Sequence, residues 1–349
     1  MNIIETTSKV IDIENESFIV AEIGINHNGD IKIACEAIAA AAEAGADSVK
    51  FQNYRTEDFI SDRKLMFEYR SEGKRIIEPQ FDMFKRCELS RDQLAILKEE
   101  ADKYGLDFHS TPTSIVGIKD LQAIGCKIIK NGSDYLTHLG LIRAMGETGL
   151  TTVLSTGMAT LTEIDQAVQT YRETGNEKLI LLHCTSSYPT PAKDVNLARL
   201  ATLSSAFGVP VGFSDHSAGT TASIGATILG ASWIEKHFTL DRDLPGPDHW
   251  FSMDPIELKD LVKSVREARD MIGDSFISPT ASEQLGRRDF RLSCVAKSEI
   301  KEGSIIKESD ITFRRPGYGF PPKDIHHIVG RKVKETLSAG IVISHTMFD

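Results

Sequence analysis

Short apolar runs alternate with longer segments of helical spacing along most of this chain. FIVAEIG (18–24) and DSVKFQ (47–52) are typical of buried strands, and the alanine-rich segment 31–45 predicts a helix that stops at a glycine. The period of two in the second run places Lys50 and Gln52 on one face of its strand. Further strands are predicted at 107–111, 127–133, 151–156, 178–185, 209–216 and 231–238, and a last helix at 255–273.

Eight strand–helix units of this kind predict an α/β protein with a (β/α)₈ TIM barrel. A doubly wound open sheet is the alternative, but it normally has fewer strands and a glycine-rich phosphate loop after the first one. Here that loop reads INHNGD. We expect the barrel at 1–275, a linker at 276–290 and a small, mostly β domain at 291–349. The long insert 53–90 interrupts the barrel rhythm and predicts a lid, a dimer contact or a binding loop.

Composition narrows the class of protein. The 349 residues are 41% hydrophobic and 26% charged, which is ordinary for a globular protein, and the net charge of −10 argues against a nucleic-acid binder. An anionic substrate would therefore need local cations or a metal. The five cysteines form no CxxC motif, and we see neither a signal peptide nor a membrane span. We predict reduced thiols and a cytoplasmic location, with no membrane or nucleic-acid partner.

Two histidines end neighbouring predicted strands. His216 closes VPVGFSDH and His237 closes ASWIEKHF, with a helical segment between them. In such a βαβ unit both strands point the same way, so both imidazoles reach the same edge of the sheet. Two imidazoles at that edge suit a divalent metal, although hydrogen-bonded core histidines are the alternative. The acidic, Pro/Gly-rich loop DRDLPGPD follows directly and is placed to close over the site.

Charged side chains converge at the same predicted edge. Lys50 and Lys130 suit a phosphorylated, carboxylated small molecule, and Glu22 and Asp248 are candidates for the acid/base carboxylates. The alternative for each lysine is a buried ion pair with Glu22 or Glu235. The serines at the strand ends could bind a ligand, or they could only cap the ends of their strands.

Three residues beside this edge are expected to have structural roles. We expect Cys184 to be a packed core thiol and His183 to be a hydrogen-bonded core histidine. Lys236 lies between two residues of the opposite face, so its side chain is expected to point away from the site.

Several ordered motifs resemble one family. AEIGINHNGD, SVKFQ, LSTGM, HCTSSYPTP, GFSDHS, EKHFT and PGPDHWFSM resemble the sialic acid synthases, and the tail with RRPGYG resembles their antifreeze-like SAF domain, a β-clip fold. Those enzymes join phosphoenolpyruvate to an N-acylated hexosamine to make a nine-carbon 2-keto sugar acid. The resemblance runs from about Phe18 to the C-terminus.

The resemblance implies roles for individual residues. His216 and His237 would hold the catalytic divalent metal, usually manganese, with magnesium or cobalt as alternatives. Catalytic roles fall on Glu22, Lys50, Lys130 and Asp248. The implied phosphoenolpyruvate cradle is Lys50, Thr111, Lys130, Ser133, Ser155, Ser186 and Ser214. The implied sugar site is Gln52, Tyr135, Tyr188, Asp248 and Arg315.

Two further features bear on assembly and substrate choice. The resemblance implies that Arg315 reaches the site of a partner subunit, which makes the protein a homodimer with swapped SAF domains. In KNGSDY (130–135), Tyr135 replaces an acidic residue that many members carry, and Ser186 stands where some carry asparagine. These departures leave the identity of the sugar open.

The residues and the resemblance together predict metal-assisted C–C bond formation. The acceptor would be N-acetylmannosamine or a 2,4-diacetamido-trideoxyhexose, and phosphate would leave with C–O cleavage. One alternative is another phosphoenolpyruvate-dependent synthase with a phosphorylated aldose acceptor, held by the cluster Arg70–Arg75 of the insert. Others are a Schiff-base aldolase that uses Lys50 or Lys130 and a non-enzymatic glycan- or ice-binding protein.

Overall fold

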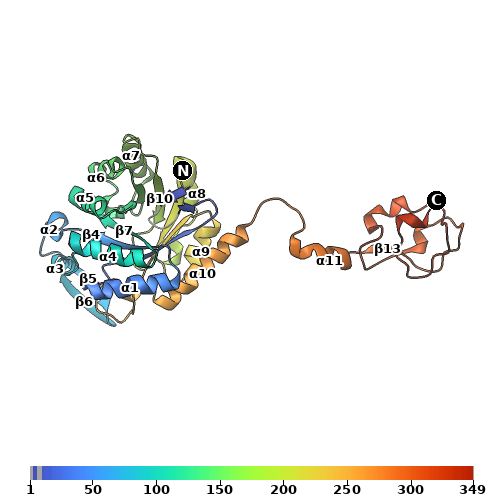
Figure 1. Cartoon of the computed structure of the whole chain (residues 1–349), viewed down its shortest axis with the longest axis horizontal. Coiled ribbons are helices and arrows are strands. Elements are labelled where there is room, and N and C mark those ends of the chain that lie inside the picture. The colour runs from blue at the N-terminus through green and yellow to red at the C-terminus, as the bar shows by residue number, and fades with distance from the viewer. Residues whose placement is uncertain (1–2, 6–9, 349) are drawn as a thin grey trace. The chain divides into compact units, whose positions relative to one another are not determined.

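The computed structural model describes residues 3–5 and 10–348. The chain divides into two compact units, Met1–Gly273 and Asp274–Asp349 (Figure 1). Each unit has a hydrophobic core of its own. Among the described residues, no helix is both long and apolar enough to cross a membrane.

The first unit is the predicted barrel. Its eight strands pair in parallel in chain order, β12 pairs with β3, and β7 and β8 pack side by side to complete the ring. The strands are β3 (Phe18–Gly24), β4 (Ser48–Asn53), β7 (Asp107–Pro112), β8 (Ile128–Lys130), β9 (Thr151–Ser155), β10 (Leu179–Cys184), β11 (Val211–Asp215) and β12 (Trp233–His237). The strand predicted at 127–133 is shorter than expected, because the chain turns at Gly132 into a 3₁₀ helix, Ser133–Tyr135.

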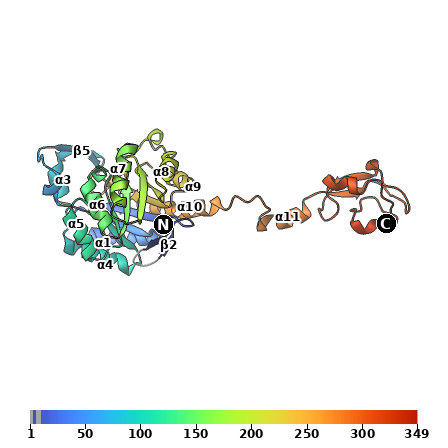
Figure 2. The same cartoon turned by 90° about the horizontal axis from the view of Figure 1, so that it is seen from above.

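Helices follow the strands and surround the barrel (Figures 1 and 2). They are α1 (Ile31–Ala44), α4 (Arg91–Lys103), α5 (Ile115–Ala123), α6 (Leu139–Glu147), α7 (Leu161–Arg172), α8 (Arg199–Phe207), α9 (Thr221–Ile228) and α10 (Pro255–Ile272). Gly45 ends α1 as predicted, with a φ of 88° that suits glycine. Ser90 begins α4 in a capping box with Gln93.

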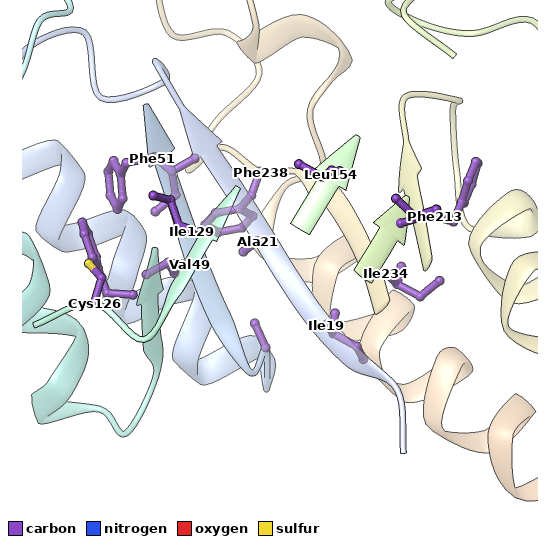
Figure 3. Close-up of a cluster of buried hydrophobic side chains, with 14 of the residues drawn as sticks. Ile19, Ala21, Val49, Phe51, Cys126, Ile129, Leu154, Phe213, Ile234 and Phe238 are labelled. Atoms are coloured by element: carbon purple, nitrogen blue, oxygen red, sulfur yellow. The ribbon is translucent and has the colours of Figure 1, made fainter. Parts of the chain in front are cut away.

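Alternation along the strands divides the barrel wall into two faces. Ile19, Ala21, Val49 and Phe51 belong to the outer cluster that packs against the helices (Figure 3). The inner face is apolar at the N-terminal end of the strands, where Phe18 and other inward residues join a separate core cluster. The N-terminal strands β1 (Ile3–Glu5) and β2 (Val10–Asp12) form a hairpin whose buried isoleucines belong to that cluster. Ser48 and His109 form a buried hydrogen bond beside Trp233 of this cluster, whereas the charged side chains that line the cavity lie toward the other end of the barrel.

The insert 53–90 folds as part of the first unit. It contains α2 (Thr56–Phe59), the antiparallel hairpin of β5 (Met66–Ser71) and β6 (Lys74–Pro79), and α3 (Gln80–Lys85). The hairpin is tied to the loop after β12, because the N–H of Gly246 donates to Ser71 Oγ at 3.0 Å. The guanidinium of Arg70 also lies over the ring of Trp250, 5.9 Å from its centre.

The second unit is small and built mostly from short extended segments, as predicted. β13 (Ser293–Ala296) pairs antiparallel with β14 (Ile311–Arg314), and isolated bridges join further segments. Its core contains Cys294, Ile306 and Phe320. The segment expected to be a linker includes a short helix, α11 (Gln284–Asp289).

The tight packing inside the barrel predicts that one added methyl group at Gly212 lowers its stability. A Cβ at Gly212 would lie 2.5 Å from Trp233 Cβ and 2.6 Å from Leu182 Cδ2. Gly212→Ala should therefore destabilise the barrel by about 2 kcal/mol, measured by thermal unfolding. Gly140→Ala in α6 is the matched control, since its Cβ would meet nothing closer than 3.5 Å. Equal melting temperatures for both variants would contradict the packing argument.

A buried histidine predicts acid sensitivity. His27 is fully buried and its Nδ1 accepts from the Gly29 N–H at 3.0 Å. Burial lowers its pKa from 6.5 to about 4. Between these pH values the unfolded chain binds a proton that the folded chain does not, so stability is lost as the pH falls through the window.

The variant His27→Asn keeps an acceptor near Gly29 and cannot titrate. Wild type should lose on the order of 3 kcal/mol more stability than this variant between pH 7 and pH 4. Unfolding curves at several pH values measure the difference. Parallel pH profiles for the two proteins would show that His27 does not carry the effect.

Candidate active site

One cavity of about 520 Å³ lies at the C-terminal ends of the barrel strands. Every barrel residue predicted from the sequence to belong to the site lines it. They are Glu22, Lys50, Gln52, Thr111, Lys130, Ser133, Tyr135, Ser155, Ser186, Tyr188, Ser214, His216, His237 and Asp248. Arg315 belongs to the second unit, where its guanidinium lies 5.2 Å from the centre of the Phe290 ring.

Four buried charges form the floor of the cavity. Lys50 Nζ lies 2.9 Å from Glu22 Oε2 and 2.9 Å from Glu235 Oε1, and Lys130 Nζ lies 3.3 Å from the same Glu235 oxygen. All four side chains are at most 5% exposed. Two ammonium groups thus face two carboxylates, so the group as a whole is neutral. Both lysines therefore form buried ion pairs, which was the alternative considered for each of them from the sequence.

The lysines keep some capacity for a ligand. An ammonium group has three N–H donors. Lys50 donates one to Glu235 Oε1 at 2.9 Å and faces Glu22 as an ion pair, and Lys130 donates one to the carbonyl of Asn131 at 3.2 Å and faces Glu235 as an ion pair. Each lysine therefore keeps at least one donor that no described residue engages, and both line the cavity.

The same charges shift each other's pKa. Burial lowers the pKa of Lys50 below its usual range, against the attraction of Glu235. Burial acts to raise the pKa of Glu235, but Lys130 and Lys50 together hold it well below its usual range. Glu235 thus stays ionised at neutral pH.

Hydroxyl groups form a small cradle beside the lysines. Ser133 Oγ donates to Ser155 Oγ at 3.0 Å and accepts from the N–H of Gly157 at 3.1 Å. A Cβ at Gly157 would lie 2.7 Å from Ser133 Oγ and closer still to Ser186 Oγ. Any side chain at this position would clash with the two hydroxyls and with the Cys184 thiol, so glycine lets the backbone approach them closely. Ser133, Ser155 and Ser186 line the cavity, and their hydroxyl groups can bind a small oxyanion.

The two histidines meet across the cavity. The ring centres of His216 and His237 are 5.4 Å apart. His216 Nδ1 lies 2.9 Å from the carbonyl of Thr185, which makes it the donor and leaves Nε2 as the basic nitrogen. His237 Nδ1 is buried without a hydrogen-bond partner among the described residues, 3.9 Å from Asp248 Oδ2. Burial and the neighbouring His216 hold the pKa of His237 well below its usual range.

The histidine pair is not part of a larger ligand cluster. Within residues 3–5 and 10–348, no group of three or more His, Cys, Asp or Glu side chains is arranged to hold a metal ion. The nearest carboxylate to the pair, Asp248, has its pKa raised to about 6 by burial. A carboxyl group with that pKa exchanges protons near neutral pH, which suits general acid–base chemistry.

One wall of the cavity was not identified from the sequence. Phe59, Phe67, Tyr69 and Phe84 of the insert line it, together with Trp250 of the loop after β12. Tyr54, Phe59 and Phe84 form an edge-to-face cluster with ring centres 5.1–5.4 Å apart. The signal was present as scattered aromatics in an insert at a strand end, for which a binding loop was one of three alternatives.

Two of the three residues expected to be structural, His183 and Lys236, are placed as predicted. His183 Nε2 lies 2.6 Å from the carbonyl of Val195. Cys184 is buried, but it is more than a packed thiol, because its Sγ lies 3.7 Å from His216 Nδ1 and 3.6 Å from Ser133 Oγ. Burial acts to raise the pKa of Cys184, but the neighbouring His216 lowers it to about 6. Lys236 points away from the cavity and pairs with Asp215.

Comparison with known proteins places this arrangement in a family. The NeuB family matches residues 37–276, and the SAF domain matches residues 293–349. An N,N'-diacetyllegionaminic acid synthase from Legionella pneumophila is 38% identical, with 93% of each chain covered. A pseudaminic acid synthase from Helicobacter pylori is 34% identical, covering 93% of this chain and 96% of its own.

A solved structure agrees. The N-acetylneuraminic acid synthetase of Leptospira borgpetersenii, crystallised with citrate, is 35% identical with a TM-score of 0.73, covering 81% of this chain and 94% of its own. The match of both domains, together with the shared barrel, shows that this chain belongs to the NeuB family and carries a C-terminal SAF domain.

Proposed function

We propose that this chain is a synthase that condenses phosphoenolpyruvate with an N-acylated hexosamine to give a nine-carbon 2-keto sugar acid and phosphate. The neutral group of two lysines and two carboxylates, beside a hydroxyl cradle and a histidine pair, is the observation that carries the proposal. The relatives named above, which are synthases of such sugar acids, support it.

The chain's own residues account for donor binding. The remaining N–H donors of Lys50 and Lys130 bind the phosphate and carboxylate of phosphoenolpyruvate, and the hydroxyl groups of Ser133 and Ser186 bind phosphate oxygens. Thr111 and the serines that line the cavity supply further donors. A chain with a net charge of −10 needs such local cations to hold a trianionic substrate.

The reaction balances without a redox partner. C3 of phosphoenolpyruvate uses its enol electron pair to bond to the aldehyde carbon of the open-chain sugar, and water adds at C2. The new C2 hydroxyl group then loses its proton to form the keto group as the C2–O bond to phosphate breaks, and phosphate leaves with the electron pair and takes up that proton. Glu22 or Asp248 takes the proton from water, and the aldehyde oxygen gains one to become a hydroxyl group.

A divalent metal fits the histidine pair. His216 Nε2 and the buried His237 Nδ1, which has no hydrogen-bond partner among the described residues, are imidazole nitrogens of the kind that metals bind, and Asp248 is the adjacent carboxylate. We propose manganese, with magnesium or cobalt as alternatives. Bound there, it would act as a Lewis acid on the aldehyde oxygen.

The cavity favours an acceptor without a phosphate group. Arg75 pairs with Glu68, and Arg70 lies over the ring of Trp250, and neither arginine is among the residues that line the cavity. The aromatic wall instead offers apolar contact for acyl or methyl groups, as in N-acetylmannosamine or a 2,4-diacetamido-trideoxyhexose. Tyr135 faces the cavity beside Gln52, Tyr188 and Asp248, and these residues are proposed to contact the sugar. Arg315 is proposed to complete the site from a swapped SAF domain in a homodimer.

The first test measures phosphate release from phosphoenolpyruvate with Mn²⁺ across a panel of phosphorylated and unphosphorylated sugars. Release should occur with an N-acylated hexosamine, stop in EDTA and return with added Mn²⁺. His216→Ala and His237→Ala should abolish release with unchanged melting, whereas His326→Ala on the second unit should not. Release that persists in EDTA, or a covalent adduct trapped by borohydride, would contradict the proposal.

A second prediction concerns the hydroxyl cradle. Gly157→Ala places a methyl group against Ser133, Ser186 and Cys184, so the hydroxyl groups proposed to bind the donor phosphate must shift. The affinity for phosphoenolpyruvate, measured by calorimetry without sugar, should fall by about tenfold or more, because charge-assisted hydrogen bonds are lost. Gly140→Ala again serves as the control. Unchanged affinity in Gly157→Ala would place the donor phosphate elsewhere.

A further inference from the structure

An ion pair lies directly behind the two histidines, on the outer face of the barrel wall. Lys236 Nζ is 2.9 Å from Asp215 Oδ2, and the two side chains are 3% and 0% exposed. The two residues are register partners on β11 and β12. Each immediately precedes a histidine, His216 or His237. Because side chains alternate across a strand, fixing one residue also fixes the direction of the next.

The Lys236 ammonium holds the turn that carries His216. Besides its pairing with Asp215, it donates to the backbone carbonyls of Ser217 and Gly219, the latter at 3.0 Å. All three of its N–H donors are therefore engaged. The turn after β11 is therefore held by the ammonium group of Lys236, which belongs to the neighbouring strand β12.

The Asp215 carboxylate completes the network. Its Oδ1 accepts from the Ser217 N–H at 2.8 Å and from the Ser217 hydroxyl at 2.6 Å. Its Oδ2 accepts from the hydroxyl of Ser223 in α9 at 2.6 Å. One carboxylate thus connects a strand, the turn after it and a helix.

The His216 turn is also held from its other side. The backbone carbonyl of His216 accepts from the Thr190 N–H at 2.8 Å, and its Nδ1 lies 2.9 Å from the Thr185 carbonyl. The ring is therefore fixed between the loop after β10 and the ion pair. A ring held on both sides presents Nε2 in one direction only.

Simple packing does not require a charged pair at this position. Two well-packed apolar residues usually stabilise a buried site as well as an ion pair or better, because burying charge is costly. Fully satisfied buried networks instead select one conformation. The conformation selected here is that of the two segments which carry the histidines.

We propose that Asp215 and Lys236 are a positioning pair that sets the separation and ring directions of His216 and His237, and thereby the affinity of this site for a divalent metal. The inference rests on the metal pair of the proposed function. Neither residue touches the cavity or the substrate. Their effect passes through the histidines that follow them in the chain.

The test is the double variant Asp215→Asn/Lys236→Met, which keeps the approximate shapes and leaves no unpaired charge. Mn²⁺ is titrated calorimetrically into the full chain, without substrate. The affinity should fall about 10- to 100-fold, as for other residues that orient metal ligands. Melting in EDTA is measured alongside, because a purely structural pair would change melting and leave metal affinity unchanged.

The matched control is Lys98→Met/Asp102→Asn in α4, which removes a 2.7 Å ion pair on another face of the barrel. It should leave Mn²⁺ affinity unchanged. Ser217→Ala is a milder second variant that removes one hydrogen bond to Asp215 and keeps both charges. It should weaken Mn²⁺ binding a few-fold, and it decides the question if the double variant does not fold.

The visible spectrum of bound Co²⁺ adds a readout of geometry. Its bands should shift in the double variant and not in the control. Wild-type affinity and an unchanged spectrum in a folded double variant, or in Ser217→Ala where the double variant does not fold, would overturn the positioning role while leaving the metal site intact. A wild-type chain that binds no divalent metal would overturn the metal site itself, and the positioning role with it.

Discussion

The pairing of Lys50 and Lys130 with Glu22 and Glu235 is the constraint on which the site depends. Burying a single charge in a barrel core is expensive, and removing one partner from a buried pair leaves that cost uncompensated. Here the two signs cancel within a few ångströms. The barrel can therefore fold around an interior that is charged enough to recognise an anion. The unused ammonium donors are what such a ligand would meet.

The barrel wall makes this arrangement possible because its outer face packs against the helices and its inner face carries the site. Outward residues such as Ile19 and Phe51 bind the helices to the sheet, and inward residues at the N-terminal end form a dry cluster. The charged residues lie farther along the same strands, on the same inward face. The residues that stabilise the barrel and the charged residues of the site are thus placed mainly at opposite ends of the same strands.

Segments outside the barrel rhythm decide the shape of the cavity. The insert and the loop after β12 are joined by the contacts of Ser71 with Gly246 and of Arg70 with Trp250. Together they place aromatic rings opposite the lysines. Loops on a rigid scaffold commonly carry specificity in this way. The charged floor suits a donor of fixed chemistry, and the aromatic wall suits the variable part of an acceptor.

The sequence by itself determined the repeating strand–helix order, and with it the barrel, because parallel strands followed by helices have few ways to close. The strand boundaries in the sequence also determined which residues lie at the strand ends. The period of two determined their faces, with Lys50 and Gln52 on the inner face and Lys236 on the outer one. Only the tertiary structure decided which lysine meets which glutamate, how the insert folds back as an aromatic wall, and that Lys236 pairs with Asp215. These contacts join residues distant in the chain, and no local pattern encodes a distance that depends on how strands register and loops return.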